Sequence, residues 1–166
     1  IGMENSMTQT QMIGLQMIRL DPEAQPRATS EEAIVAEYAE AMQAKAQFPP
    51  VVVFYDGSSY WLADGYHRVR AAKFAGIAEI ISEVRQGTQR DAQLFAAGAN
   101  AAHGLRRTNA DKRRAVNMLL DDSEWSKWSD REIARHCSVG HPLVAQLRRD
   151  RDAGRSSSEV NSQKTI

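Results

Sequence analysis

One short stretch of the chain, ADGYHRVRAAKFAG (residues 63–76), concentrates side chains that can bind an anion. Gly65 lies where a strand is expected to end and a helix to begin. The N-terminus of a helix binds anions through its free backbone amides and its dipole. His67, Arg68 and Arg70 add side-chain donors, and an arginine can hold two phosphate oxygens at once. The stretch therefore predicts a site for a phosphate group.

A purely structural interpretation of this stretch is equally open. Asp64 can pair with one of the two arginines while the other side chains are solvated. Cationic groups near the positive end of a helix dipole are unfavourable unless an anion is present, and such local conflicts often mark functional sites. The spacing alone does not decide between the two.

A second segment, SDREIARHCSVGHPLVAQLRRD (residues 129–150), is typical of two helices joined by a tight turn. Ser129 and Glu132 form a capping box, and Pro142 suits the first turn of the second helix. Apolar residues on both helices can pack face to face: Ile133, Ala134, Cys137, Val144 and Leu147. The segment therefore predicts a compact helical pair.

The second helix of this pair would present His141, Gln146, Arg148 and Arg149 outward. Such side chains are expected on a helix that meets base edges and phosphates in a major groove. The spacing resembles the DNA-binding helix–turn–helix motif, although Ser138 stands where the turn glycine is usual. An ordinary helical hairpin within a bundle is the alternative interpretation.

Both candidate sites depend on the elements that position them. The expected order is a disordered segment over 1–14, a strand within 15–22, a helix over 29–47, a hairpin over 51–64, a helix over 66–76 and a strand within 77–87. From Thr88 only helices are expected. We therefore divide the chain into an α+β domain (15–87), a helical region (88–154) and a disordered tail (155–166).

Composition narrows the classes of protein. No apolar run reaches the ~20 residues that a membrane span needs, so no membrane partner is expected. The N-terminus lacks the pattern of a secretion signal. The single cysteine, Cys137, excludes an internal disulfide and fits a reducing compartment, so we expect a cytoplasmic protein.

The formal net charge of zero conceals a gradient along the chain. Residues 1–50 hold three basic against seven acidic residues, whereas residues 101–155 hold twelve basic against eight acidic. This asymmetry suggests that the C-terminal part faces a polyanion, although solvated helices of mixed charge would give the same count.

The stretch at Gly65 resembles the signature of the ParB/sulfiredoxin fold. Gly65, Arg68, Arg70 and Ala71 match the Gly-Glu-Arg-Arg-x-Arg-Ala motif of ParB-type partition proteins. Gly65, His67 and Arg68 also match the Gly-Cys-His-Arg motif of sulfiredoxins. The resemblance implies an α+β fold, with a small mixed sheet and its helices followed by an all-helical helix–turn–helix region.

The likeness continues on both sides of this signature. Residues 25–27 (Gln-Pro-Arg) resemble a ParB-like element, and residues 100–116 resemble the helical region that precedes the helix–turn–helix of ParB-like regulators. The elements occur in the family's order over roughly residues 15–150. The resemblance therefore implies a DNA-binding protein of the plasmid-partition or transcription-regulator kind.

The family's nucleotide site would fall at the Gly65 corner, with CTP or ATP and Mg²⁺ as its ligands. The resemblance implies phosphate contacts from Gly65, His67, Arg68 and Arg70, with Arg27 and Asn100 nearby. Ala99 and His103 stand in the second nucleotide motif, Glu-Asn-x-x-Arg, where the family has its glutamate and arginine. The missing carboxylate would help to hold magnesium, which puts hydrolysis in doubt.

The interpretation as a DNA-binding protein also assigns the DNA-contacting residues. Double-stranded DNA would meet His141, Gln146, Arg148 and Arg149, while backbone charge would come from Arg106, Arg107, Arg113 and Arg114. Because a helix–turn–helix usually reads paired half-sites, we expect a homodimer on DNA. No dimerisation domain follows Gly154, so self-association would use the helical half unless the chain is part of a longer protein.

Two other functions stay open. The first is an enzyme, either a CTP or ATP hydrolase or a nuclease, with Asp64, His67, His103 and Asp111 as metal candidates that lack any dedicated metal-ligand spacing. The second is a DNA-binding adaptor that has lost the nucleotide. Sulfiredoxin activity is not expected, because Tyr66 replaces the nucleophilic cysteine.

Overall fold

The computed structural model describes residues 8–21, 32–99 and 107–162, with the side chains of the last helix described up to Ser156. The first part of the chain forms β1 (Gln9–Gly14), the 3₁₀ turn η1 (Leu15–Met17), β2 (Ile18–Arg19), α1 (Glu32–Gln43), β3 (Val51–Tyr55), β4 (Tyr60–Asp64), α2 (Tyr66–Phe74) and β5 (Glu79–Gln86). The second part forms α3 (Gln89–Gly98), α4 (Asn109–Asp121), η2 (Trp125–Lys127), α5 (Asp130–Cys137) and α6 (His141–Ser162).

The five strands form one mixed sheet in the order β1-β5-β3-β4-β2. The β3–β4 hairpin predicted from VVVFYDGSSYWLAD is confirmed, with antiparallel pairing from Val52 opposite Asp64 to Tyr55 opposite Tyr60. β3 also pairs with β5 in parallel, which places the hairpin at the centre of the sheet. The predicted α+β fold class is thus confirmed.

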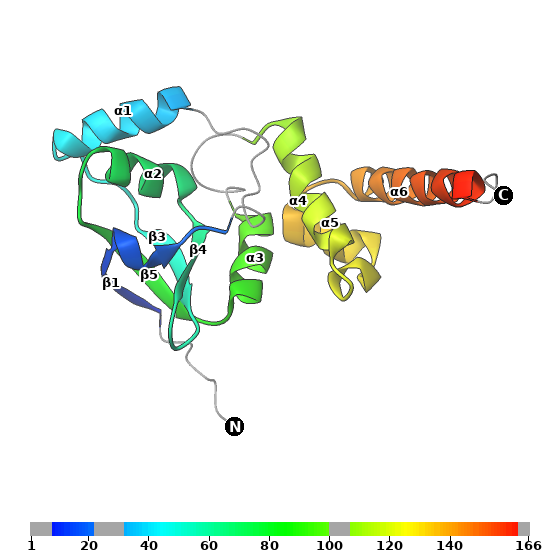
Figure 1. The fold of residues 1–166 in the computed structure, drawn as a ribbon, viewed down its shortest axis with the longest axis horizontal. Helices are drawn as coiled ribbons and strands as arrows, with labels where there is room; N and C mark the ends of the chain where they lie inside the picture. Colours follow the sequence, from blue (N-terminus) through cyan, green and yellow to red (C-terminus); the bar gives the residue numbers. More distant parts are fainter. Residues whose placement is uncertain (1–7, 22–31, 100–106, 163–166) are drawn as a thin grey trace.

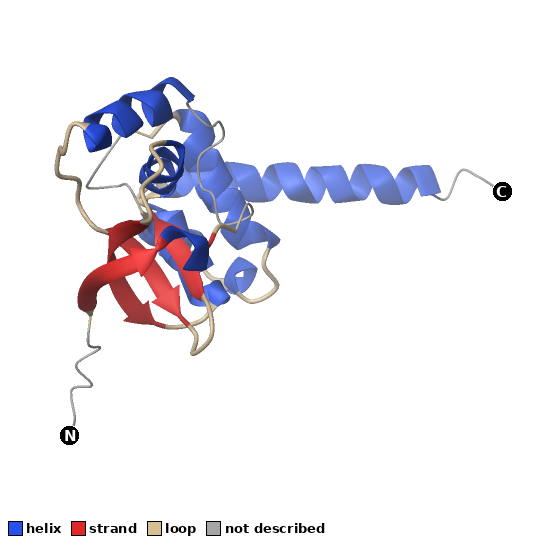
Figure 2. Ribbon diagram, turned by 60° about the vertical axis from the view of Figure 1, so that its left-hand side comes forward, coloured by secondary structure: helices blue, strands red, loops and turns tan. Residues whose placement is uncertain are grey.

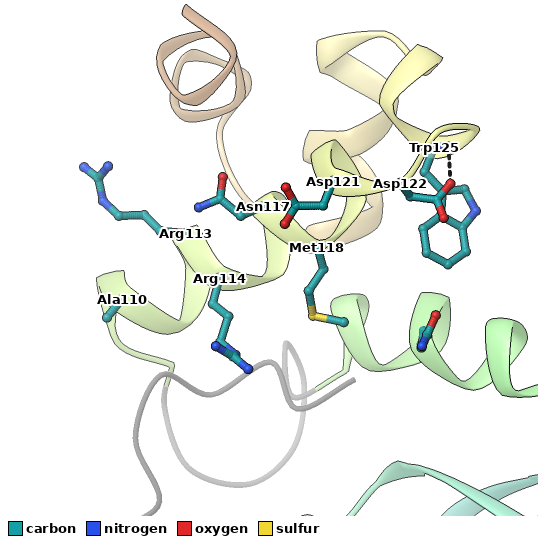
Figure 3. Close-up of a pocket in the computed structure, with 9 residues that line it drawn as sticks. Ala110, Arg113, Arg114, Asn117, Met118, Asp121, Asp122 and Trp125 are labelled. Atoms are coloured by element: carbon teal, nitrogen blue, oxygen red, sulfur yellow. Dashed lines mark hydrogen bonds between the residues drawn. The ribbon is translucent and has the colours of Figure 1, made fainter. Parts of the chain in front are cut away.

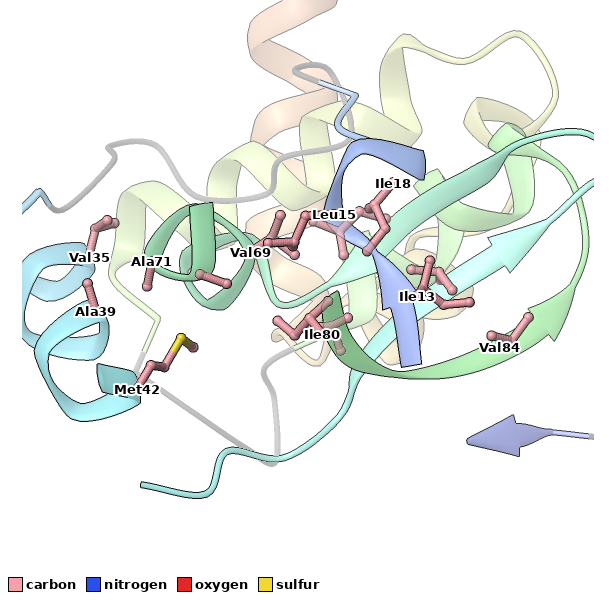
Figure 4. Packing of buried hydrophobic residues seen from close by; sticks show 14 residues of the cluster. Ile13, Leu15, Ile18, Val35, Ala39, Met42, Val69, Ala71, Ile80 and Val84 are labelled. Carbon is pink, nitrogen blue, oxygen red and sulfur yellow. The ribbon is translucent and has the colours of Figure 1, made fainter. Parts of the chain in front are cut away.

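One face of the sheet is covered by α2, and α1 packs on α2 (Figures 1 and 2). Figure 4 shows the apolar cluster between these layers, which joins Val35 and Ala39 of α1 to Val69 of α2 and to Ile80 and Val84 of β5. Val51, Val53 and Val69 have no exposed surface. This cluster fixes the position of α2, which carries the arginine-rich stretch.

The opposite face of the sheet is covered by α3. Val52 and Phe54 of β3 and Ala63 of β4 pack against Ala92 of this helix. The other side of α3 contributes Ala97 to the core of the helical half. α3 therefore belongs to both cores. The sequence predicts a boundary between residues 87 and 88, but the packing continues across it.

Two predictions about the ends of the chain are wrong. Residues 9–14 were expected to be disordered, but they form β1, which pairs with β5 from Gln9 opposite Val84 to Gly14 opposite Glu79. Only Ile13 of this edge strand is buried, so the apolar alternation that marks a strand is too weak to read from the sequence.

The expected tail after residue 154 is instead helical as far as Ser162. The N-terminal half of α6 is fixed by packing, and extending an existing helix is far easier than starting one. Gly154 costs only about 1 kcal/mol relative to alanine, and no proline follows to stop the helix. Figures 1 and 2 show the C-terminal half of α6 projecting away from the rest of the molecule.

A helix that crosses a bilayer must be both long and strongly apolar, and the helices of the described segments can be judged by these two properties. None of them meets both requirements.

Candidate functional site

The pair α5–α6 has the local geometry that its sequence predicts. The capping box at the start of α5 is confirmed, since the Ser129 side chain accepts from the backbone N–H of Glu132 and the Glu132 side chain accepts from that of Ser129. Ser138 ends α5 in the left-handed conformation, with φ of 55°. The backbone N–H of Val139 then donates to Ala134 at 2.9 Å, which closes the turn before α6 begins.

The two helices are held together by an apolar core. Ile133, Cys137 and Val144 have no exposed surface, and Leu119 and Leu120 of α4 belong to the same cluster. Burial raises the pKa of the Cys137 thiol to about 11, so this group stays protonated at neutral pH. The core leaves the outer side of α6 to solvent.

The outer side of α6 carries three of the predicted DNA-contacting residues. His141, Gln146 and Arg149 are all exposed. Their positions fall within one broad side of a helix that has 3.6 residues per turn. The sequence prediction placed these side chains outward, and the structure agrees.

Arg148 is directed elsewhere. Its guanidinium donates to Asp130 Oδ1 at 2.8 Å, to the Ser126 carbonyl at 2.7 Å and to the Trp128 carbonyl at 2.8 Å. These acceptors lie in η2, at the start of α5 and between the two. The side chain predicted to face outward therefore ties α6 to this segment, because unsatisfied carbonyls there need a donor.

Arg107 also has an internal role. Its Nη2 donates to the carbonyls of Cys137 at 2.8 Å and Ser138 at 3.2 Å. The last carbonyls of a helix have no intrahelical partner, and a cation is favourable at that end of the dipole. Arg107 thus supports the turn between α5 and α6 from the start of α4.

Arg113 and Arg114 are exposed on α4. They line one end of a groove of about 820 Å³ that lies between α4, α3 and η2, together with Gln93, Ala110, Asn117, Met118, Asp121, Asp122 and Trp125 (Figure 3). The opposite end of the groove is acidic. Both of its carboxylates are paired, Asp121 with Arg151 and Asp122 with Arg90.

A cluster around Arg90 of α3 was not foreseen from the sequence. Arg90 donates to Asp122 and to Glu124 at 2.9 Å, and its guanidinium lies 4.0 Å from the centroid of the Trp125 ring. The hydrogen bonds from Arg90 hold the pKa of the Asp122 carboxyl well below its usual range. The partners are more than 30 residues apart in sequence, so no local pattern reveals the pairing.

The Gly65 corner has the predicted strand-to-helix geometry. Gly65 caps α2 with φ of 107°, a region that residues with a side chain rarely adopt. A Cβ at this position would lie 2.5 Å from Val51 Cγ1. The first helical bond joins the Val69 N–H to the Gly65 carbonyl, so the amides of residues 66–68 have no acceptor within the helix.

The structure does not bring the two arginines of this corner together. Arg68 donates to the carbonyls of Pro49 and Pro50 at 2.6 and 2.9 Å and lies 3.3 Å from Asp64. Arg70 is directed to Glu32 of α1, at 2.8 Å. Residues two apart lie on nearly opposite sides of a helix, which explains the separation.

Of the other residues predicted to bind the anion or a metal ion, some lie within the described part of the chain and some lie outside it. His67 is buried in α2. Arg27, Asn100 and Arg106 lie outside the described residues, as does His103. Within the described ranges no group of three histidine, cysteine, aspartate or glutamate side chains could hold a metal ion. Of the two described carboxylates proposed for metal chemistry, Asp64 pairs with Arg68 and Asp111 completes the capping box of α4.

Comparisons with known proteins agree with this architecture. A family model described as the ParB N-terminal domain matches residues 2–101. A possible regulatory protein of the streptomycin biosynthesis operon of Streptomyces griseus is 31% identical over 140 residues, which is 84% of this chain and 38% of the relative. The transcriptional regulator NovG of Streptomyces niveus is 36% identical over 106 residues, which is 64% of this chain and 32% of the relative. The chain thus spans about a third of the length of these curated relatives.

Solved structures share the fold at lower identity. The C-terminally truncated chromosome-partitioning protein ParB of Caulobacter crescentus, in complex with the centromeric parS site, superimposes with a TM-score of 0.55 at 17% identity, over 82% of this chain and 69% of that one. The same protein in complex with CTP-γ-S gives 0.51 at 19% identity, over 84% and 76% of the two chains. These likenesses establish the arrangement of the elements.

Proposed function

The chain belongs to the ParB N-terminal domain family, and we propose that it is a transcription regulator that binds duplex DNA with the N-terminal half of α6. Two curated relatives at 31% and 36% identity are named as regulatory proteins. A solved structure of the same fold holds a specific DNA site. The proposed partner is therefore double-stranded DNA.

One observation carries this proposal. Arg148 bonds α6 to the start of α5, and Arg107 bonds to the turn that precedes α6. His141, Gln146 and Arg149 lie on the exposed side of the helix. A helix that is fixed at its base and polar on its outer side can enter a major groove and reach base edges. Arg113 and Arg114 on the neighbouring α4 supply positive charge for the phosphate backbone.

Fluorescence anisotropy of a labelled duplex tests the proposal. The wild-type chain should bind with an affinity that falls as salt is raised, because phosphate contacts release counterions. Arg149→Ala should weaken binding by about 1–3 kcal/mol, as expected for a lost base contact.

Lys73→Ala is the matched control: this exposed lysine lies in the last turn of α2, a helix that Figure 1 shows apart from α6, and the substitution removes the same charge. Binding should be unchanged in this variant. Equal losses in the two variants, or no binding by the folded wild type to any duplex, would refute the proposed function.

The number of chains bound to each duplex is a separate prediction. We propose that two copies occupy one duplex, because helix–turn–helix proteins usually read paired half-sites. Light scattering of the saturated complex should give the mass of two chains and one duplex. A mass with one chain per site would remove the dimer from the proposal.

A second candidate function is nucleotide binding at the N-terminus of α2. It is favoured by the N-terminal turn of α2, where the amides of residues 66–68 have no acceptor within the helix, and by the CTP-γ-S held by the Caulobacter protein of the same fold. Ala99 stands where the family's second nucleotide motif has the glutamate that would help to hold magnesium, and alanine offers no ligand. We therefore propose binding without dependence on Mg²⁺.

Calorimetry with CTP, ATP and GTP tests this candidate, with and without duplex DNA. Arg70→Ala should weaken a nucleotide's binding, because the Arg70 guanidinium lies 5.7 Å from the ring centroid of Tyr66, the first residue of α2. Lys73→Ala, at the other end of the same helix, should not. Absence of heat with all three nucleotides, with DNA binding intact, would instead support an adaptor that has lost the nucleotide.

A further inference from the structure

The exposed side of α6 carries a chain of hydrogen bonds between side chains. Arg149 Nη2 donates to Gln146 Oε1 at 3.1 Å, and Gln146 Nε2 donates to Asp150 Oδ1 at 3.0 Å. These three residues are all exposed, so the array lies on the surface that the proposed function directs toward DNA.

The array fixes which way the amide of Gln146 points. A guanidinium only donates and a carboxylate only accepts, so the amide oxygen must face Arg149 and the amide nitrogen must face Asp150. Each amide atom uses one bonding position within the array. Gln146 is therefore left with one free N–H and one free lone pair.

These free positions match the edge of one base. Adenine presents an acceptor (N7) and a donor (N6) in the major groove, which pair with the N–H and the oxygen of a glutamine amide. Arg149 keeps most of its N–H groups, and its fork matches the two acceptors N7 and O6 of guanine. Because residues three apart in a helix are separated by ~4.5 Å along its axis, the two side chains can reach neighbouring base pairs ~3.4 Å apart.

We propose that Gln146 reads an adenine and Arg149 a guanine on neighbouring base pairs, with Asp150 as the residue that orients the glutamine amide. This inference rests on the proposed DNA-binding function and assigns the base contacts of that site. Asp150 is a positioning residue, since it acts through Gln146. Its carboxylate also repels phosphates, which lowers the affinity for every duplex whatever its sequence.

Selection from a random duplex library tests the assignment. Sequences enriched by the wild-type chain should contain adjacent A·T and G·C pairs with the two purines as defined positions. Gln146→Ala should lose the preference at the adenine position alone, by about tenfold, and Arg149→Ala at the guanine position alone. Arg113→Ala, on the neighbouring α4, should weaken all sequences equally.

Asp150→Ala tests whether Asp150 orients the Gln146 amide, because a residue that only stabilised α6 would not affect the preference for adenine. Without the carboxylate the amide of Gln146 can turn over and present its donor and acceptor in reverse. Discrimination at the adenine position should then fall about threefold or more, while affinity for unrelated duplexes rises because a negative charge is removed.

The outcomes separate this inference from the function on which it rests. If the chain binds duplexes but Gln146→Ala keeps every base preference, or Arg149→Ala weakens all sequences uniformly as a phosphate contact would, the base assignment is wrong and the DNA-binding function stands. If no duplex is enriched by the folded wild-type chain, both are wrong.

Discussion

At the scale of single residues, two adjacent arginines of α6 differ completely in role. Arg148 makes three hydrogen bonds to the segment that carries η2 and the start of α5. Arg149 bonds only to Gln146 among the residues described and remains exposed. The helical period separates their directions by about 100°, so adjacent positions serve the interior and the surface.

Their substitutions should therefore separate stability from binding. Arg148→Ala removes a donor from two carbonyls and one carboxylate, and we expect it to lower the free energy of unfolding by about 1–3 kcal/mol. Arg149→Ala should change it by less than ~0.5 kcal/mol, as surface substitutions usually do. Urea unfolding followed by circular dichroism measures both. Equal stability of the two variants would contradict the bracing role of Arg148.

Gly65 is required by two independent constraints, and a comparison with Gly57 can separate them. Both glycines have positive φ, 107° and 102°, so alanine at either position adds strain of about 1–2 kcal/mol. A Cβ at Gly57 has nothing within 4 Å, whereas one at Gly65 would meet Val51.

Gly65→Ala should therefore destabilise the protein by about 1–3 kcal/mol more than Gly57→Ala does, because only the first overpacks the core. Thermal unfolding of the two variants gives the difference directly. If the losses are equal, the contact between Gly65 and Val51 does not constrain the corner.

Sequence patterns predicted the position of this corner but not the partners of its arginines. A glycine between a strand and a helix is a local signal, and it was read correctly. The carbonyls that hold Arg68 lie 18 and 19 residues earlier, and Glu32 lies on another helix. Such pairings depend on how the elements pack, which spacing along the chain does not encode.

At the scale of elements, the Arg90 cluster joins α3 to the segment after α4. Asp122 accepts from Arg90 and also from the backbone N–H groups of Glu124 and Trp125, at 2.8 and 2.9 Å. These bonds favour the ionised carboxylate. A lowered pKa in the folded state means that Asp122 contributes stability above the pKa of the unfolded chain and loses it as pH falls.

The melting temperature should accordingly drop as the pH is lowered below about 4, the usual pKa of an aspartate. Asp122→Asn should melt lower than wild type at neutral pH and show a smaller drop on acidification. Asp152→Asn, which changes an exposed aspartate of α6, is the control and should follow the wild-type profile. Parallel profiles for wild type and Asp122→Asn would refute this role.

Elements with strong periodic or capping signals were predictable, and weakly marked ones were not. The capping box at Ser129, the proline at the start of α6 and the β-branched run of β3 all identified their elements. β1 has one buried residue and is defined by its pairing with β5. The end of α6 follows from propagation of a packed helix through residues most of which are weak helix formers.

At the scale of the whole molecule, α3 links the two cores. Its contacts with β3 and β4 on one side and with α4 and α5 on the other set the orientation of α6 relative to the sheet. His136 of α5 adds a ring-nitrogen contact of 2.6 Å to the Leu94 carbonyl of α3. The candidate corner on α2 and the exposed side of α6 are therefore parts of one connected structure.

The fold shows which of the basic residues in the C-terminal half are exposed and which bond to other parts of the chain. Arg148, Arg151 and Arg107 are used internally, whereas Arg113, Arg114 and Arg149 are exposed. A count of charges could not distinguish these groups, because burial and pairing depend on the fold. The exposed subset is the one that can meet a polyanion.

Hydrogen exchange with and without duplex DNA tests the central claim most directly, since it locates the protected surface on the full chain. The account predicts slower exchange in the turn and first half of α6, residues 138–150, with Gln146→Ala plus Arg149→Ala abolishing the protection. Protection of β3, β4 and α2 with α6 unchanged would contradict it, because DNA would then be bound by a different surface.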